Sequence, residues 1–493
     1  MVGVGAPASP MSPAPRWKPP QQKAADKSPL GAALDDEYGA MDKNDRIFRL
    51  DKFTLESDIE LPQVSVAYRT WGELNAAGDN VLFIAHALTG NAACDAWWAM
   101  LHGEGRAFDP SKYYIVCANT LGSCYGTTGP LHEMPVDPAP AWVAPREGTS
   151  RAAAGRRYAA DFPFCTVRDT VALHYELLKH LGVTKLHAVV GGSAGGMQAL
   201  EWALMYPQFV SRVVSMACGA MQSAWQIGIS ESQRQALYRD AKWNDGFYAP
   251  DAPPAEGLSI ARQQAMIWYR SQPAYDKKFG RHLQPPSPGG AAARAKESSG
   301  GGGTGAPPTH SVEGYLEHQG TKFVERFDAN CYVALTRLID SHDVGRGRGG
   351  VEAALATLRC PVLVIGLSSD VLYPIGMQRE LARLLPRGTL RVVVSEQGHD
   401  GFLLEGETIG ALVTDALDAD TDETTHEVID ISLDVQPPTG SPVAAPLASG
   451  RDTSRLPTSQ KEMNAMLAAD ATKTSPRRRA PMLSPAQEWF FGI

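Results

Sequence analysis

The chain has 493 residues, of which 43% are hydrophobic and 20% charged, and its formal net charge is −8. This acidic balance argues against a nucleic-acid-binding surface, and no apolar run approaches the ~18–20 residues that a bilayer span requires. The seven cysteines are odd in number and form no C-x-x-C pair, which argues against a disulfide framework or structural zinc. We therefore expect a cytoplasmic protein without a metal site. Length alone suggests two or three domains, but open α/β sheets with insertions often form one unit.

The N-terminal part of the chain begins with a stretch that does not suit a packed core. Residues 1–44 are rich in Pro, Ala and Lys, a composition typical of a disordered tail. Alternating apolar and polar residues then predict strands within 47–55 and 64–72. Residues 81–90 predict a buried strand that ends in His-Ala-Leu-Thr-Gly, and residues 113–130 predict another strand followed by a glycine-rich loop. Such loops often line the mouth of a pocket.

The stretch HAVVGGSAGGMQALEW (187–202) follows a predicted helix at 166–182 and joins a buried strand to another helix. Ser193 satisfies G-x-S-x-G with Gly191 and Gly195, the motif of a nucleophile elbow, in which a strained turn exposes the serine hydroxyl. The pentapeptide alone also suits a glycine-rich turn with an incidental serine, or a weak dinucleotide loop. The strand before the motif and the helix expected from Met197 onwards favour the nucleophile.

Two downstream residues complete a possible catalytic triad. Asp370 ends a buried strand run at 360–370, and His399 lies in the loop after the strand run that opens 390–403. Taken singly, they could be a turn aspartate and a surface histidine. The order serine, acid, histidine is that of α/β-hydrolases, and all three follow predicted strands. We predict that His399 takes the proton of Ser193 while Asp370 fixes the histidine tautomer and stabilises the imidazolium.

An oxyanion hole is expected beside this triad. The backbone N–H of Ala194 lies at the predicted helix start, and the loop after an early strand supplies the second donor in this fold, for which we choose Leu88. His86 lies in the same loop, but it precedes the serine in the chain. We therefore expect a structural role for it.

The middle of the chain does not alternate strands with helices. After a strand within 211–220, residues up to 350 contain helical patterns and no strand before the sheet resumes near 360. The helical stretches are 229–240, 257–271 and 311–343. Within them, residues 283–309 form a Pro-, Gly-, Ser- and Ala-rich stretch that predicts a flexible loop. A final helix is expected at about 402–417.

The predicted fold class is α/β, an α/β-hydrolase fold with a mostly parallel central sheet flanked by helices and an inserted helical lid domain. The expected segments are a disordered tail (1–44), the first part of the core (45–220), the lid insertion (221–350) with its flexible loop (283–309), the second part of the core (351–417) and a mostly disordered C-terminal tail (418–493).

The lid carries a possible second piece of chemistry. Arg262, Met266 and Tyr269 are spaced i, i+4 and i+7, so they share one face of a helix. An ordinary ion pair and a packed ring would explain such a face. However, Asp400 lies beside His399, so one cation and one anion would flank the nucleophile. That combination matches the carboxylate and ammonium groups of a free α-amino acid.

These motifs make the chain resemble the homoserine O-acetyltransferase family of α/β-hydrolases over residues from about 45 to 415. The matching segments are LTG (88–90), GGSAGGMQALEW (191–202), SAWQIGISESQRQALYRD (223–240), GLSIARQQAMIWYRS (257–271), YLEHQGTKFVERFDANCYVALTRLIDSHDVGRG (315–347), LSSDVLYP (367–374) and GHDGFLLE (398–405).

The resemblance implies that Ser193 is the nucleophile, with Asp370 and His399 as its partners. It also implies that Arg262 and Asp400 bind the acceptor amino acid with Tyr269 nearby. It further implies a homodimer that acts in methionine biosynthesis, with acetyl-CoA as co-substrate and no bound cofactor or metal.

The chain departs from the family pattern in two ways. The family usually has Met after the nucleophile, where this chain has Ala194; the oxyanion donor is a backbone N–H, so we expect function to survive with a roomier acyl pocket. The 283–309 loop and the long C-terminal tail resemble fungal insertions.

The predicted reaction is acetyl transfer from acetyl-CoA to L-homoserine through an acetyl-serine intermediate, under a lid that limits water. Relatives with serine as acceptor, or with succinyl-CoA as donor, are alternatives, although residues 223–235 resemble the homoserine enzymes. An esterase and a catalytically inactive binding module are further alternatives. An intact triad argues against the inactive module, and the Arg262 and Asp400 charges argue against a plain esterase.

Overall fold

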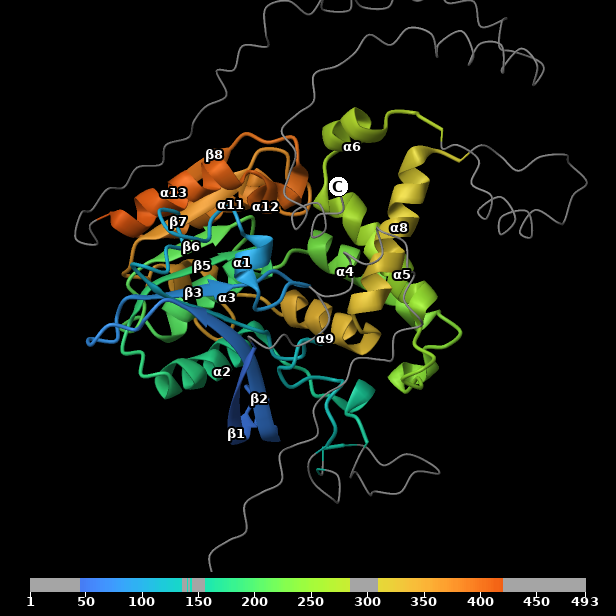
Figure 1. Cartoon of the computed structure of the whole chain (residues 1–493), viewed down its shortest axis with the longest axis horizontal. Coiled ribbons are helices and arrows are strands. Elements are labelled where there is room, and N and C mark those ends of the chain that lie inside the picture. The colour runs from blue at the N-terminus through green and yellow to red at the C-terminus, as the bar shows by residue number, and fades with distance from the viewer. Residues whose placement is uncertain (1–44, 135–139, 141, 144–155, 284–308, 420–493) are drawn as a thin grey trace, which may run out of the picture. The chain divides into compact units, whose positions relative to one another are not determined.

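The computed structural model describes residues 45–134, 140, 142–143, 156–283 and 309–419. The predicted N-terminal tail, nearly all of the predicted C-terminal tail and nearly all of the 283–309 loop lie outside these ranges. The strands in the described ranges form one eight-stranded sheet in the order β1-β2-β4-β3-β5-β6-β7-β8 (Figure 1). β2 pairs antiparallel with β1 and β4, and the other neighbours are parallel. The α/β fold and the mostly parallel sheet are confirmed.

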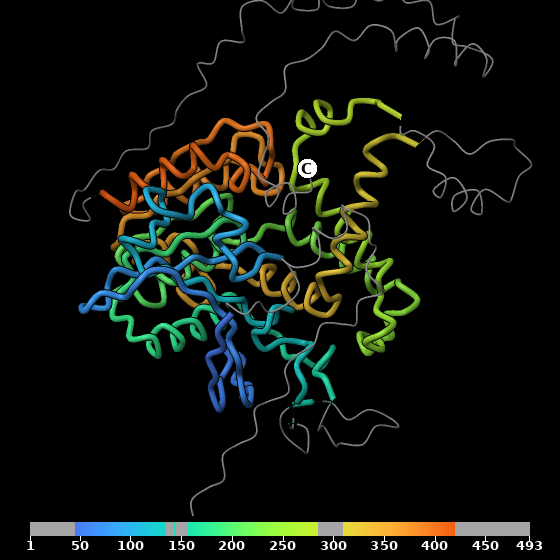
Figure 2. The backbone as a smooth tube through the Cα atoms, viewed as in Figure 1, coloured from blue at the N-terminus to red at the C-terminus, as the bar shows by residue number. Residues whose placement is uncertain are grey.

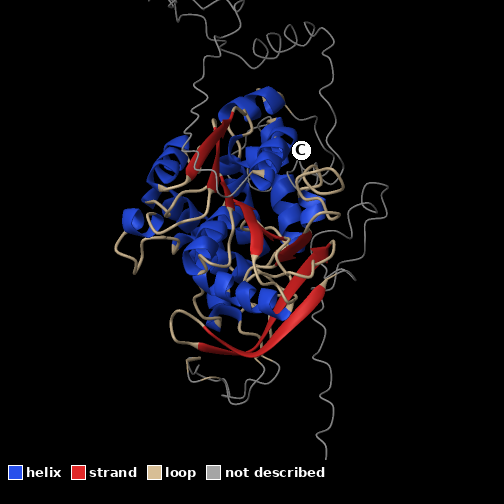
Figure 3. Cartoon of the chain, turned by 90° about the vertical axis from the view of Figure 1, so that its left-hand side faces the viewer, coloured by secondary structure: helices blue, strands red, loops and turns tan. Residues whose placement is uncertain are grey.

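The strands follow the predicted runs closely. They are β1 (Arg46–Thr54), β2 (Glu60–Trp71), β3 (Val81–Ala85), β4 (Tyr114–Ala118), β5 (Leu186–Gly192), β6 (Val213–Met216), β7 (Val362–Leu367) and β8 (Gly388–Val393). β3 and β4 are buried at every position, as expected of strands covered on both faces. Figure 3 shows the helices that flank the sheet.

The helices confirm most of the predicted helical stretches and add others. They are α1 (Cys94–Trp97), α2 (Val167–His180), α3 (Ala194–Met205), α4 (Ala224–Tyr238), α5 (Ala255–Tyr269), α6 (Gln272–Phe279), α8 (Ser311–Arg326), α9 (Ala329–Asp340), α10 (Val351–Leu355), α11 (Ile375–Leu384), α12 (Gly401–Leu404) and α13 (Gly406–Asp418). The sequence patterns did not predict α1, α6, α10 or α11. None of these helices combines the length and apolar character that a bilayer crossing demands.

Several predicted helix boundaries were wrong. The helix expected at 229–240 begins at Ala224, and the helix expected at about 402–417 is divided into α12 and α13. The single stretch 311–343 is two helices, because Phe327 has extended backbone and the Asp328 side chain accepts a hydrogen bond from Cys331 N at 3.0 Å, which caps α9. The helix assigned from Met197 onwards begins at Ala194, directly after the serine, which agrees with the expected place of the Ala194 amide at the helix start.

Residues 221–350, between β6 and α10, form a helical insertion that comprises α4, α5, α6, α8 and α9 in its described part. These helices gather on one side of the sheet, to the right in Figures 1 and 2. α5 packs against both α4 and α8, and it also contacts the 3₁₀ turn Gly398–Asp400. The insertion thus reaches the loop that carries His399.

A buried carboxylate anchors α3 in the core. Glu201 is 1% exposed, and it accepts from Arg168 Nε of α2 at 3.1 Å and from Arg348 Nη2, before α10, at 2.8 Å. Since the removal of one partner from a buried ion pair leaves an uncompensated charge, this group should matter for stability.

We expect Glu201→Ala to lower the free energy of unfolding by about 3 kcal/mol, because two arginines lose their shared carboxylate. Urea unfolding followed by circular dichroism would measure the change. Glu176→Ala is the matched control, since Glu176 pairs with Lys179 on the surface of α2, with side-chain exposures of 38% and 47%. It should cost less than about 1 kcal/mol. Equal losses in the two variants would contradict the role of Glu201.

Candidate active site

The turn at Ser193 has the strained geometry of a nucleophile elbow. β5 ends at Gly192, α3 begins at Ala194, and Ser193 between them has φ 57° and ψ −124°. A positive φ is uncommon for a residue with a side chain, and such strain is retained where the surroundings hold it in place. The Ser193 N–H donates to the Met216 carbonyl at the end of β6 at 2.9 Å, which secures the turn to the sheet.

Gly195 allows the elbow to approach the neighbouring strand. A Cβ atom at this position would overlap the carbonyl oxygen of Ala85, the last residue of β3. Any larger residue would therefore push the start of α3 away from β3. The contact brings the start of the loop that follows β3 next to the elbow.

The structure brings Ser193, Asp370 and His399 together. His399 Nε2 lies 2.9 Å from Ser193 Oγ, and His399 Nδ1 lies 2.8 Å from Asp370 Oδ2. The other Asp370 oxygen, Oδ1, accepts from the amides of Leu372 and Tyr373 at 2.9 and 2.8 Å. Asp370 is thus fixed on both sides, which favours the tautomer with the proton on Nδ1 and leaves Nε2 to accept from the serine.

Three aromatic rings surround the His399 imidazole. The ring centroids of Tyr373, Phe402 and Tyr269 lie 5.2, 5.5 and 5.9 Å from that of the histidine. Tyr269 was among the predicted site residues, whereas Tyr373 and Phe402 were not. Both lie within three residues of a predicted triad member and inside segments that resemble the family, 367–374 and 398–405.

The histidine turn packs directly on the helical insertion. Gly398 has φ +72°, and a Cβ atom there would lie 2.5 Å from the carbonyl carbon of Arg270. The backbone at Arg270 and Ser271 links α5 to α6. Glycine is required at 398 both for its backbone conformation and for this close approach.

The two predicted oxyanion donors lie on the elbow and on the adjoining loop. Within the described residues, neither the Leu88 nor the Ala194 amide has a hydrogen-bond partner. The loop around Leu88 is shaped by His86, whose Nδ1 lies 2.7 Å from Ala87 O and whose Nε2 accepts from Thr120 N at 3.0 Å. Burial lowers the pKa of His86 to about 4, so this ring stays neutral.

Arg262 and Asp400 are both buried near the triad but form no direct ion pair in the described structure. The Arg262 guanidinium packs over the rings of Phe323 and Tyr269, at 5.1 and 5.7 Å from their centroids. The carboxylate of Asp400 instead has Arg270 Nη1 at 3.9 Å. The site therefore contains one cation and one anion that a zwitterionic ligand could bridge.

Burial dominates the ionisation of these groups. It raises the pKa of Asp400, and the nearby Arg270, His399 and Arg262 oppose that rise. It lowers the pKa of Arg262, as does the neighbouring Arg326, and it raises the pKa of Tyr269. A buried charge without a close partner is costly, so a ligand that carries the opposite charges would stabilise both.

Arg326 of α8 was not among the predicted site residues, but it contacts the loop beside the candidate site. Its Nη1 donates to Thr89 O at 3.1 Å and to Tyr125 Oη at 2.6 Å. It therefore ties the insertion to the loop that carries Leu88. No spacing or motif distinguished this arginine from others on the same predicted helix.

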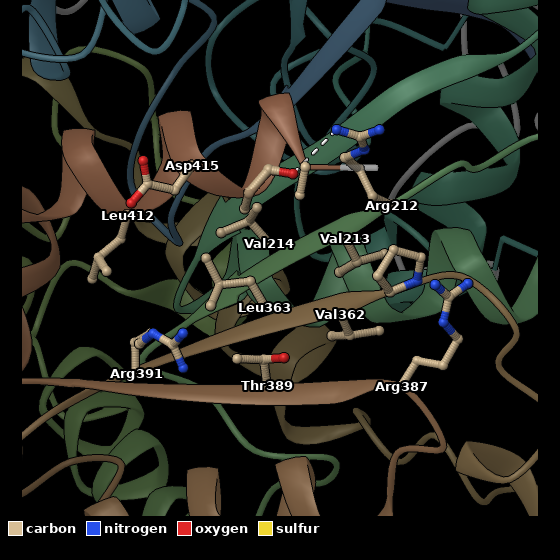
Figure 4. Close-up of a pocket in the computed structure, with 13 residues that line it drawn as sticks. Arg212, Val213, Val214, Val362, Leu363, Arg387, Thr389, Arg391, Leu412 and Asp415 are labelled. Carbon is tan, nitrogen blue, oxygen red and sulfur yellow. Dashed lines mark hydrogen bonds between the residues drawn. The ribbon is translucent and has the colours of Figure 1, made fainter. Parts of the chain in front are cut away.

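A cavity of about 210 Å³ lies away from these residues, between α13 and the strands β6, β7 and β8 (Figure 4). Its charged lining consists of Arg212, Arg387, Arg391 and Asp415. The first residues of β6 and β7, at the amino ends of these strands, line the cavity. The candidate site residues instead follow the carboxyl ends of their strands. This cavity is therefore not part of the candidate active site.

Comparisons with known proteins identify the family and the fold. Residues 80–406 match the family model of the alpha/beta hydrolase fold. The chain is 45% identical over 365 residues to the homoserine O-acetyltransferase of Chlorobium chlorochromatii. The aligned residues make up 74% of this chain and 92% of that protein. Among solved structures, it resembles the homoserine O-acetyltransferase of Bacillus anthracis (TM-score 0.66, 24% identity, 77% of this chain and 98% of that chain). It also resembles esterase E22, with a TM-score of 0.65 and 24% identity over 76% of this chain and 99% of that chain.

We predict that Gly398→Ala lowers the rate at which p-nitrophenyl acetate acylates the serine by about 100-fold. The added methyl group cannot coexist with the Arg270 backbone, so the turn and His399 must move by a fraction of an ångström or more. Release of p-nitrophenol measures the rate, and thermal unfolding shows whether the variant is folded.

Gly376→Ala is the matched control, because a Cβ atom at that position in α11 meets nothing within 4 Å. It should leave the acylation rate unchanged. A Gly398→Ala variant that reacts at the wild-type rate would contradict the proposed packing of the histidine turn.

Proposed function

Because the chain belongs to the homoserine O-acetyltransferase family of α/β-hydrolases, we propose that it transfers acetyl from acetyl-CoA to the hydroxyl of L-homoserine. It is an acyltransferase, and the product is O-acetyl-L-homoserine. The observation that carries this proposal is the set of relatives with 45% identity over most of their length. The fold by itself does not distinguish a transferase from an esterase, since it resembles both in solved structures.

In the first half-reaction, we propose that His399 Nε2 accepts the proton of Ser193 Oγ as the oxygen attacks the thioester carbonyl. The 2.9 Å and 2.8 Å contacts of His399 with Ser193 and Asp370 support these roles. The amides of Leu88 and Ala194 would stabilise the tetrahedral oxyanion; one such donor is typically worth about 10²–10³ in rate. The C–S bond then breaks, His399 returns the proton to the sulfur of CoA, and acetyl-serine remains.

In the second half-reaction, the hydroxyl of homoserine attacks the acetyl-serine. His399 takes the hydroxyl proton, the same two amides stabilise the new oxyanion, and the bond between the acetyl carbon and Ser193 Oγ breaks. The proton passes from His399 to the serine, which regenerates the free enzyme. The same base thus serves both halves of a ping-pong cycle.

We propose that Arg262 binds the carboxylate of the acceptor and that Asp400 binds its ammonium group, with Tyr269 beside them. Their burial without a direct ion pair supports this assignment. The Tyr269 ring lies between the two elements involved, since it contacts both the Arg262 guanidinium and the His399 ring. The acceptor would be held with its hydroxyl toward the histidine.

We propose that the insertion (221–350) acts as a lid over a core formed by 45–220 and 351–417, and limits hydrolysis of the acetyl-serine. The contact of α5 with the histidine turn supports this role. We further propose a cytoplasmic homodimer that acts in methionine biosynthesis. Support comes from the family and from the seven cysteines, which all lie in described ranges and are free thiols.

Thiol release from acetyl-CoA, measured with L-homoserine, with L-serine or without an acceptor, tests the function. We expect fast release only with homoserine. Because homoserine and serine differ by one methylene, which a pocket distinguishes by only ~1–3 kcal/mol, serine should be a poorer acceptor rather than an inert one. Ser193→Ala should reduce turnover by about 10⁴-fold or more, while Ser111→Ala, in a distant turn, should not. Equal release without an acceptor would identify a hydrolase.

Arg262→Gln should weaken the use of homoserine without affecting formation of the acetyl-enzyme. The loss of a charge-assisted hydrogen bond costs about 1.5–3 kcal/mol, or roughly 10- to 160-fold in kcat/KM for homoserine. Acylation by p-nitrophenyl acetate should stay within about twofold of the wild-type rate.

Arg391→Gln, in the cavity at the other end of the sheet, is the matched control and should leave both rates unchanged. Equal losses in acylation and in homoserine use for Arg262→Gln would contradict the assignment.

A further inference from the structure

A second buried arginine, Arg270, lies behind the proposed acceptor site. Its side chain is 8% exposed, its Nη2 donates to Gln397 Oε1 at 2.6 Å, and its Nη1 lies 3.9 Å from Asp400 Oδ2. Within the described residues, Nη1 has no hydrogen-bond acceptor. A buried guanidinium nitrogen that points at a carboxylate without a short hydrogen bond calls for a functional explanation.

Arg270 is held in place by several contacts with the histidine turn. Ser271, its neighbour, donates from Oγ to Glu396 O, and Gly398 packs against the Arg270 backbone. Lys277 of α6 adds a surface ion pair with Glu396 at 2.8 Å. These contacts fix the guanidinium relative to Asp400, which belongs to the same turn.

The position of Arg270, directly after α5, differs from that of Arg262 within the helix. Arg262 packs over aromatic rings and has no carboxylate partner among the described residues, as a residue that awaits a ligand should. Arg270 Nη1 is inaccessible to solvent, so a ligand cannot replace its contact with Asp400. Its effect on a bound acceptor must therefore pass through Asp400.

We propose that Arg270 is a positioning residue, whose guanidinium orients the Asp400 carboxylate and stabilises its charge so that Asp400 can bind the ammonium group of the acceptor. This inference rests on the proposed function, which assigns Asp400 to that ammonium group. It adds a residue that acts on acceptor recognition without touching the acceptor.

The charged groups around Asp400 support this role of Arg270. Burial raises the pKa of Asp400; Arg270 is the largest opposing influence, followed by His399 and Arg262, while Asp370 reinforces the rise. The phenols of three tyrosines are also close enough to Asp400 for its charge to influence their pKa values; they are Tyr269 of α5, Tyr275 of α6 and Tyr315 of α8. Burial raises the pKa of each phenol, so all three stay neutral from about pH 6 to about pH 9.

Removal of the Arg270 charge should raise the pKa of Asp400 further. The carboxylate would then take up a proton at a higher pH than in the wild type, and a neutral acid cannot bind an ammonium ion as an ion pair. The defect should therefore be largest at low pH and should diminish as the pH rises through the new pKa.

The test compares Arg270→Gln with Arg270→Lys from about pH 6 to about pH 9. For Arg270→Gln we expect the KM for homoserine to rise by about tenfold or more at the acidic end, and the ratio of variant to wild type to fall as the pH rises. Acylation by p-nitrophenyl acetate should change by less than about twofold. Arg270→Lys should restore much of the homoserine affinity, because lysine keeps the charge but not the planar fork.

A second acceptor separates this role from a structural one. 4-Hydroxybutanoate has the carboxylate and hydroxyl of homoserine without the ammonium group, so Arg270→Gln should not change its kcat/KM. In an Asp400→Asn background, the effect of Arg270→Gln on homoserine should largely vanish, since the two residues act as one unit.

A pH-independent ratio, equal losses with both acceptors, or an equal loss of acylation would each overturn the role of Arg270. A wild-type enzyme that forms the acetyl-enzyme but ignores homoserine would instead overturn the proposed function, and this inference with it. Acylation by p-nitrophenyl acetate and the use of homoserine are measured in separate assays. A failure of the role of Arg270 is therefore distinguishable from a failure of the proposed function.

Discussion

The strained turn at Ser193 is the constraint on which the rest of the site depends. Its positive φ allows β5 to end and α3 to begin within one residue, and the approach of Gly195 to the end of β3 leaves no room for a side chain. The energetic cost of the strain is offset by the packing of α3 in the core, where Glu201 is held by two arginines. The serine is therefore presented at a fixed height above the sheet.

The parallel sheet supplies the other partners for a geometric reason. The carboxyl ends of parallel strands meet at one edge, so the loops after β3, β5, β7 and β8 converge although their residues are far apart in the chain. Leu88, Ser193, Asp370 and His399 follow these four strands in that order. The opposite end of the same sheet forms the arginine-lined cavity of Figure 4, which contains none of the proposed catalytic residues.

The helical insertion adds positive charges to a site in which the loops after the strands supply the carboxylates of Asp370 and Asp400. α5 contributes Arg262 near its middle, Arg270 follows its last residue, and α8 contributes Arg326, which contacts the loop of Leu88. Because α5 also contacts the histidine turn, the proposed acceptor-binding groups and the proposed base are held by the same packing. The contact between α5 and the histidine turn thus fixes the position of one proposed group relative to the other.

The sequence by itself determined the α/β class, nearly every strand and the order of Ser193, Asp370 and His399, because buried strands and the elbow glycines leave local patterns. Local patterns say nothing about which distant segments meet. Only the tertiary structure decided that Tyr373 and Phe402 enclose His399, that Asp400 faces Arg270 rather than Arg262, and that Arg326 reaches Thr89. It also divided the predicted 311–343 helix at Asp328. These features depend on packing between elements, and packing has no signature in a single stretch of sequence.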